Sequence, residues 1–340
     1  MRRYSSRGYS SRRDSMKRKL IIICILVAII LAVLGIVSAY FAKVDRERKE
    51  QQLAYRQEGI GYYEQGDYEE ALKCFQNALA DSKGNIGDVE MDICFYKART
   101  QYELGDTEGA LKTYQAVIEY KENPKAYFLR GTLYLQLGEE SKALADYNKA
   151  VDMEKEDYEL YFSIYDILAA KDQVEEGQKI LKEALDIRGK KDTDKVKKGH
   201  IYYLLGEQEK AIDLLEDASK EEVEGYYYLF LVYDSMENSE KALENLNTYM
   251  EKEEHPDSYK LYEMGNSLLN KEKYERAEEC FLKALELDKV PNKQEIMKKL
   301  VVTYEKSKDF TSAKEVMKKY IEEYPEDEAA LREYTFLETR

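Results

Sequence analysis

The chain has 340 residues, of which 36% are charged, and it contains 31 Tyr, 4 Pro and no Trp. This balance is closer to a long array of exposed helices than to a sheet-based enzyme. The formal net charge is −15, and because residues 1–19 hold eight Lys or Arg, the rest of the chain is more acidic still. Nucleic acid is therefore excluded as an expected partner, since binding to phosphate needs a basic face.

The first segment, residues 1–19, is rich in Arg and Ser and has almost no aliphatic side chains. Such a composition cannot bury enough surface to offset the entropy of folding. We expect it to be a disordered, basic tail on the cytoplasmic side of a membrane.

Residues 20–42 begin with the apolar run "LIIICILVAIILAVLGIVSAYF", which no charge interrupts. At about 1.5 Å per residue, a helix of this run would span roughly 33 Å, enough to cross a bilayer core of about 30 Å. We predict a transmembrane signal anchor, with a signal peptide cleaved after Ala39 as the alternative. The basic residues before the run place the N-terminus in the cytoplasm and everything after residue 42 outside it. Residues 43–52 then form a juxtamembrane linker.

A stretch that recurs along the rest of the chain begins with "GYYEQGDYEEALKCF", residues 61–75. Eight copies follow one another every 31 to 39 residues when aligned on a small residue. The small column is Ala71, Ala110, Ala143, Gly177, Ala211, Ala242, Ala277 and Ala313. Four residues later, each copy has a large apolar residue: Phe75, Tyr114, Tyr147, Leu181, Leu215, Leu246, Phe281 and Met317.

This period and pattern resemble the tetratricopeptide repeat, a helix, turn and helix of about 34 residues. The first copy carries most of the signature residues of the family, namely Tyr55, Gly59, Tyr62, Gly66, Tyr68, Ala71, Phe75 and Ala78. The resemblance implies an all-α fold, an α-α superhelix of about eight helix-turn-helix repeats over residues 53–325. Residues 326–340 are expected to form a C-terminal capping helix.

The columns also have a physical explanation. Gly residues on the first helix of a copy, together with the small column on the second, allow two helices to approach to about 8–10 Å. The Gly of each "GD" or "GE" pair ends the first helix in a left-handed conformation. Three copies depart from this pattern, with Tyr165, Phe230 and Val301 at the first-helix position, and we expect their helix pairs to be splayed or shifted. The longest loops are expected at "DSKGNIGDVE" and at "RGKKDTDKVKKGH".

No residue pattern indicates an enzyme, a cofactor site or a metal site. The two histidines, His200 and His255, lie far apart in sequence and have no metal-ligand spacing around them. Cys74, Cys94 and Cys280 are an odd set that argues against a disulfide framework, although their redox state stays open.

In the family, the inward-facing positions lie on the first helix of each repeat, where they line a concave surface. The resemblance places nine large apolar residues at such positions, which we take as the candidate binding residues for a protein or peptide. They are Tyr63, Phe95, Tyr102, Phe128, Leu135, Phe162, Tyr203, Tyr227 and Tyr262. The alternative is that some of them pack within the array.

A carboxylate clamp, by which some members of the family hold the C-terminus of a peptide, is not expected. That clamp uses Lys and Asn at set inward positions, whereas this chain has Arg56 and Ile60 in the first copy and Tyr262 and Asn266 in the seventh.

The sequence thus indicates a membrane-anchored bacterial tetratricopeptide scaffold that binds proteins or peptides in assembly of the cell envelope. Two alternatives are a docking receptor of the import type facing the cytosol and a glycan- or lipid-binding envelope protein.

Overall fold

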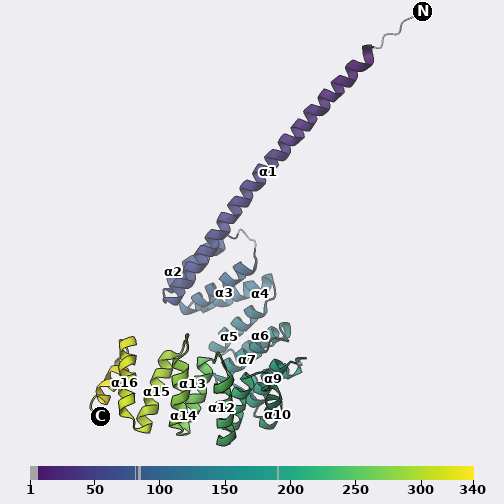
Figure 1. Ribbon diagram of the computed structural model, residues 1–340. Helices are drawn as coiled ribbons and strands as arrows, with labels where there is room; N and C mark the ends of the chain where they lie inside the picture. The colour runs from purple at the N-terminus through teal and green to yellow at the C-terminus, as the bar shows by residue number, and fades with distance from the viewer. Residues whose placement is uncertain (1–6, 81, 83–85, 190) are drawn as a thin grey trace, which may run out of the picture. The chain divides into compact units, whose positions relative to one another are not determined.

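The structure is a computed structural model that describes residues 7–80, 82, 86–189 and 191–340, apart from the side chains of residues 7–18, 20–25 and 28. Throughout these residues the regular structure is helical (Figure 1). The chain divides into two compact units, unit 1 at Met1–Glu154 and unit 2 at Lys155–Arg340, and each is described by itself.

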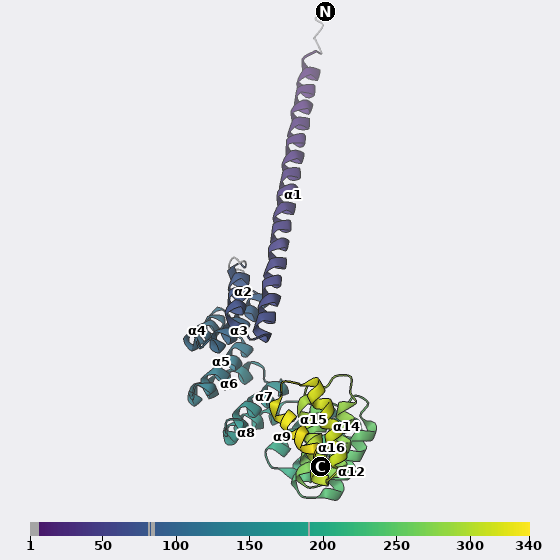
Figure 2. The same cartoon turned by 90° about the vertical axis from the view of Figure 1, so that its left-hand side faces the viewer.

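Unit 1 contains three helix pairs, the first, second and third repeats. Its helices are α1 (Arg7–Glu64), α2 (Tyr68–Ala80), α3 (Asp88–Glu103), α4 (Thr107–Tyr120), α5 (Pro124–Gln136) and α6 (Glu140–Met153). Each odd-numbered helix is the first helix of a repeat and each even-numbered helix is the second. The long helix α1 packs against α2 only near its C-terminal end, and its remainder extends beyond the repeats of the unit (Figure 2).

Unit 2 contains five further pairs and one last helix. Its helices are α7 (Tyr158–Ala169), α8 (Val174–Glu183), α9 (Asp192–Leu204), α10 (Gln208–Ala218), α11 (Glu224–Ser235), α12 (Ser239–Lys252), α13 (Ser258–Asn270), α14 (Tyr274–Leu285), α15 (Lys293–Ser307), α16 (Phe310–Glu323) and α17 (Glu328–Leu337). A short 3₁₀ helix, η1 (Ala184–Asp186), follows α8. Within the unit, the first helices of successive repeats also contact one another, as α9 does α11 and α11 does α13.

The core of each repeat is built on the two columns seen in the sequence. All eight members of the small column and all eight large apolar residues four positions later are buried. The first-helix glycines explain why: a Cβ atom added at Gly265 would lie 2.7 Å from Cε1 of Phe281, and one at Gly199 would lie 2.5 Å from Cγ of Leu215. The ring or branched side chain therefore fills the space that the glycine leaves open, which confirms the predicted register.

The turn between the two helices of every repeat has a residue with positive φ. Four of these residues are the predicted glycines Gly66, Gly105, Gly138 and Gly206, with φ between 74° and 80°. The other four are not glycine: Asp172, Glu237, Glu272 and Lys308, with φ between 58° and 68°. The turn geometry is thus retained in repeats four, six, seven and eight without the residue that adopts it most easily.

The three departures from the first-helix pattern are accommodated in two ways. In repeat four, Gly177 of the small column lies against the ring and backbone of Tyr165, so the second helix leaves room for the larger first-helix residue. In repeats six and eight, Phe230 and Val301 are buried in the hydrophobic core. The large first-helix residue of these repeats is thus packed against a glycine or buried in the core, and the expectation that the helix pairs are splayed or shifted stays a prediction.

The N-terminal part differs from the predicted arrangement. A single continuous helix, α1, covers most of the predicted disordered tail, the predicted span at 20–42, the linker at 43–52 and the first helix of repeat one. No proline interrupts this sequence, and Arg, Lys, Met and Leu are good helix formers. Residues 1–6 of the tail lie outside the described residues.

The membrane prediction is contradicted. In the part of the chain that the structure describes, no helix has both the length and the apolar character that crossing a membrane requires. This finding overturns the predicted single-pass location with a cytoplasmic N-terminus and an extracytoplasmic array. The apolar run is only one part of α1, which continues into the charged sequence after Ala42. The side chains at positions 20–25 and 28 of the predicted span lie outside those described.

The predicted loops also need one correction. The segment expected as an extended loop at residues 188–200 is mostly helix, because α9 begins at Asp192. The backbone N–H of Lys191 donates to Oδ2 of Asp194 at 3.0 Å, which caps this helix start. The loop between α2 and α3 contains residues 81 and 83–85, which lie outside the described residues.

The final helix, α17, packs against α16 and buries Ala330 and Leu337. The carboxylate of Asp327 caps its start by accepting from the backbone N–H groups of Ala329 and Ala330, each at 3.1 Å. Elsewhere in the described chain, Cys74, Cys94 and Cys280 are free thiols, and burial raises the pKa of Cys280 to about 12. Burial also raises the pKa values of the Cys74 and Cys94 thiols, which favours the less reactive protonated form.

Candidate partner-binding face

The nine predicted binding residues divide by burial into two groups. Phe95, Leu135 and Tyr227 are buried, with 5–8% of each residue exposed, so they pack within the array. The other six are half-buried: Tyr63, Tyr102, Phe128, Phe162, Tyr203 and Tyr262. A half-buried ring has one face or edge open to solvent, which leaves these six as the candidates for contact with a partner.

In unit 1 the candidate rings contact charged side chains. The guanidinium carbon of Arg99 lies 5.2 Å from the ring centroid of Tyr63, and the Tyr63 hydroxyl donates to Glu103 at 3.3 Å. The buried ring of Phe95 lies 4.8 Å from Nζ of Lys125. These are separate cation–π contacts between neighbouring repeats, each of which adds a modest amount to stability.

In unit 2 the candidate rings converge. Phe162 on α7 stacks on His200 on α9, with ring centroids 4.6 Å apart, and His200 stacks on Tyr228 on α11, with centroids 4.3 Å apart. Tyr203, one turn after His200, lies 6.5 Å from it in a nearly parallel plane. We call these four residues, Phe162, His200, Tyr203 and Tyr228, the ring ladder. It joins the first helices of repeats four, five and six.

The electrostatics of the ring ladder keep its histidine neutral. Burial among the rings lowers the pKa of His200 to about 3, and the nearby charge of Lys260 acts in the same direction. Lys260 also lies over the rings of Tyr227 and Tyr228, with Nζ 5.3 Å and 5.9 Å from their centroids, and forms an ion pair with Glu224. His200 is therefore a neutral aromatic ring within the ring ladder.

Two members of the ring ladder, His200 and Tyr228, were not among the predicted residues. A signal for His200 is present in the sequence. Val196 aligns with the inward-facing Phe162 of the preceding copy. His200 follows Val196 by four positions and precedes Tyr203 by three, so these three residues lie on one helix face. Tyr228 follows the predicted Tyr227, whose hydroxyl donates to Glu263. In this repeat it is Tyr228 that stacks on His200, while Tyr227 is buried.

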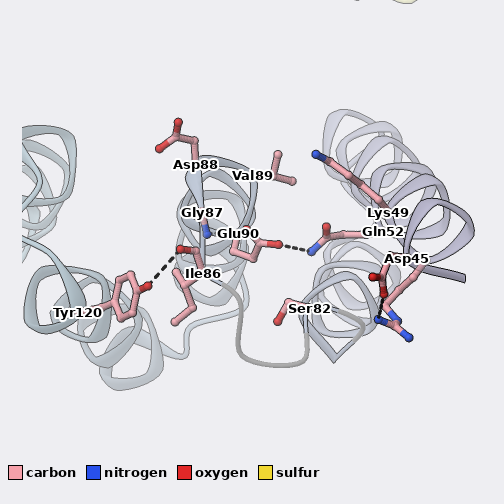
Figure 3. Close-up of a pocket in the computed structure, with 11 residues that line it drawn as sticks. Asp45, Lys49, Gln52, Ser82, Ile86, Gly87, Asp88, Val89, Glu90 and Tyr120 are labelled. Carbon is pink, nitrogen blue, oxygen red and sulfur yellow. Dashed lines mark hydrogen bonds and ion pairs between the residues drawn. The ribbon is translucent and has the colours of Figure 1, made fainter. Parts of the chain in front are cut away.

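A polar hollow of about 720 Å³ lies in unit 1 between α1 and the start of α3 (Figure 3). Its side chains are joined to one another: Gln52 donates to Glu90 at 2.9 Å and to the carbonyl of Ala78 at 3.1 Å, and Tyr120 donates to the carbonyl of Ile86 at 3.2 Å. Gln52 thus connects α1, α2 and α3. The adjoining loop includes residues outside those described, so we assign this hollow a structural role only.

A smaller cavity of about 320 Å³ lies at the end of unit 2, between α15, α16 and α17. Val301, Val302 and Met317 form its apolar part, and Lys298, Glu305, Asp327 and Glu333 are its charged residues. When the copies are aligned, Lys298 takes the position of Phe95 and Glu305 takes that of Tyr63, which are two inward-facing positions of the first helix. The predicted inward face therefore ends in a cavity.

Comparison with protein families identifies the repeats. Tetratricopeptide repeat profiles match residues 52–85, 95–157, 258–289 and 299–327, which fall in both units. The chain therefore contains tetratricopeptide repeats, as the two columns predicted. It has the architecture of a helical solenoid, a scaffold suited to binding other proteins.

Individual relatives are distant. Among solved structures, yeast Tom70 is 15% identical with a TM-score of 0.53, and the match covers 80% of this chain and 60% of that one. A tetratricopeptide repeat protein from Parabacteroides merdae is 18% identical with a TM-score of 0.46, covering 75% of this chain and 99% of that one. The Protein CTR9 homolog of Arabidopsis thaliana is 27% identical over 112 residues, 33% of this chain, and the chain spans only 10% of that relative. These likenesses concern the fold.

Proposed function

We propose that this chain is a non-enzymatic scaffold that binds a segment of a partner protein along the inward face of unit 2, with the ring ladder as its central contact. The observation that carries the proposal is the stacking of Phe162, His200 and Tyr228 across three successive first helices. These positions belong to the side of the repeat that lines the concave surface in the family.

Physical reasons favour the rings as an anchor. Aromatic side chains that are already stacked lose little conformational freedom when a partner arrives, so less binding energy is spent on ordering them. Rings of this kind often dominate the energy of a protein interface. Because His200 stays neutral, an apolar side chain that covers the ring ladder does not have to desolvate a charge.

Adjacent tyrosines on α9 provide a matched test. Tyr203 belongs to the ring ladder, whereas the ring of Tyr202 faces α10, with Nζ of Lys210 5.2 Å from its centroid. A photo-crosslinking p-benzoylphenylalanine at position 203 should capture the partner in cells, and the same group at position 202 should not. With the purified partner, Tyr203→Ala should weaken binding about tenfold or more, while Tyr202→Ala should change it by less than about twofold.

Equal crosslinking from both positions, or equal effects of the two alanine variants on affinity, would contradict the proposal. Circular dichroism of both variants checks that the helices are intact. A role in the cell envelope is not part of the proposal, because it depended on the membrane segment that the described residues do not support.

A further inference from the structure

The cavity at the end of unit 2 has an apolar part and an unbalanced acidic wall. Val302 on α15 and Met317 on α16 contribute apolar surface, and α17 closes one side with Ala330. The volume of about 320 Å³ is sufficient for a large side chain. Because the cavity is open, it can receive such a group from a partner that lies along the inward face.

The basic residues around this cavity are already engaged. Nζ of Lys298 lies 2.8 Å from Oδ2 of Asp327, and Asp327 also accepts from the hydroxyl of Tyr320 at 2.7 Å. The guanidinium of Arg340 stacks on the rings of Phe310 and Phe336, 5.2 Å and 4.6 Å from their centroids. Lys298 is therefore neutralised by its own partner, and Arg340 is held by aromatic contacts.

Glu305 on α15 and Glu333 on α17 both line this cavity. Burial, followed by a hydrogen bond with the Glu333 carboxyl and the charge of that group, raises the pKa of Glu305 to about 7, although Arg340 opposes the shift. The residues facing this pair from the packed elements are Lys298 with its partner Asp327, and Arg340. Among the ion pairs of the described chain, none involves Glu305 or Glu333.

We propose that this cavity binds an arginine side chain of the partner, with its methylene groups against Val302 and Met317 and its guanidinium between the carboxyls of Glu305 and Glu333. A guanidinium is planar and donates through several N–H groups, so it can bond two facing carboxylates at once. The inference rests on the proposed function, because Glu305 is an inward-facing position of the same solenoid. It makes the end of the inward face a site for a positive charge, the opposite of a clamp for a carboxylate.

Binding of this kind should release a proton. Burial and the neighbouring Glu333 favour the protonated form of Glu305, and a bound cation stabilises its ionised form. The proton leaves the Glu305 carboxyl for solvent, and the guanidinium supplies the compensating charge. The heat of binding should then depend on the ionisation enthalpy of the buffer.

The experiment uses the full chain with butylguanidinium as the probe and butylurea as its neutral isostere. Methyl NMR of Met317 should show binding of butylguanidinium at least about tenfold tighter than that of butylurea. Calorimetry at about pH 6 in two buffers should report proton release. The double variant Glu305→Gln with Glu333→Gln should lose both the preference for butylguanidinium and the proton release. The single change Glu333→Gln, on the terminal helix, should reduce both.

Equal binding of the two probes, no binding of butylguanidinium, or a preference retained in the double variant would overturn this inference. The Met317 signal of the ligand-free variants shows whether the cavity is intact. Tyr203→Ala should leave butylguanidinium binding unchanged. If Tyr203→Ala weakens binding of the partner while the chain shows no preference for butylguanidinium, only the arginine site is wrong and the proposed function stands.

Discussion

Repeats four and seven of unit 2 differ in which helix provides the glycine that lies against a large side chain of the other helix. In repeat seven the first helix carries Gly265, and the ring of Phe281 on the second helix covers it. In repeat four the first helix carries Tyr165, and Gly177 on the second helix lies against it. Repeat seven thus has a small residue on both helices, Gly265 and Ala277, whereas repeat four has one only on the second helix. The two repeats also differ in how far the ring beside the glycine has to move when a side chain is added there, Phe281 in repeat seven and Tyr165 in repeat four.

The largest effect on stability is expected when the large apolar residue of the second helix is replaced by alanine. Phe281→Ala should lower the free energy of unfolding by about 3–5 kcal/mol, because the lost ring leaves a cavity over Gly265. Leu181→Ala, at the same column position in repeat four, should cost less, about 2–3 kcal/mol, because a smaller buried side chain is removed. Urea unfolding followed by circular dichroism measures both. A larger loss of unfolding free energy for Leu181→Ala than for Phe281→Ala would contradict this order.

A smaller effect is expected from filling the glycine of repeat seven. In Gly265→Ala the new Cβ atom would lie 2.7 Å from Cε1 of Phe281, so the ring has to shift, at a cost of about 1–3 kcal/mol. The same unfolding measurement applies. Phe281→Leu in the Gly265→Ala background should recover part of the loss, and the absence of any recovery would mean that the strain lies elsewhere.

The smallest effect is expected at the glycine of repeat four. In Gly177→Ala the Cβ atom would meet Cδ2 of Tyr165 at 3.0 Å, a contact that a small ring movement relieves. Alanine also favours a helix over glycine by about 1 kcal/mol, so the net change in unfolding free energy should stay within about 1 kcal/mol of zero. In a Tyr165→Ala background the substitution should become stabilising. If Gly177→Ala lowered the free energy of unfolding as much as Gly265→Ala does, the ring of Tyr165 would be as unable to move as that of Phe281.

The sequence was sufficient for features that repeat and insufficient for contacts that do not. The small column and the residue four positions later recur in every copy, so this spacing, with the resemblance to the tetratricopeptide repeat, was sufficient to predict the helix pairs and their register. The contact of Gly177 with Tyr165 in repeat four could not be predicted in this way, because the identity of the facing residue changes no period. The stacking of His200 on Phe162 and Tyr228 joins three repeats, and the Glu305–Glu333 pair joins a repeat to the non-repeating α17. The hydropathy of the run at 20–42 suggested a membrane span that the described structure does not support.

The turns with positive φ have a mechanical consequence. Four of the five repeats in unit 2 place Asp172, Glu237, Glu272 or Lys308 in a left-handed conformation, which costs a non-glycine residue about 1 kcal/mol or more. Strain of this kind is released as soon as the turn opens, so under tension these turns should yield before the helices separate. The weakest links of unit 2 would then lie inside its repeats, at the turns that join the two helices of one pair, and not between neighbouring repeats.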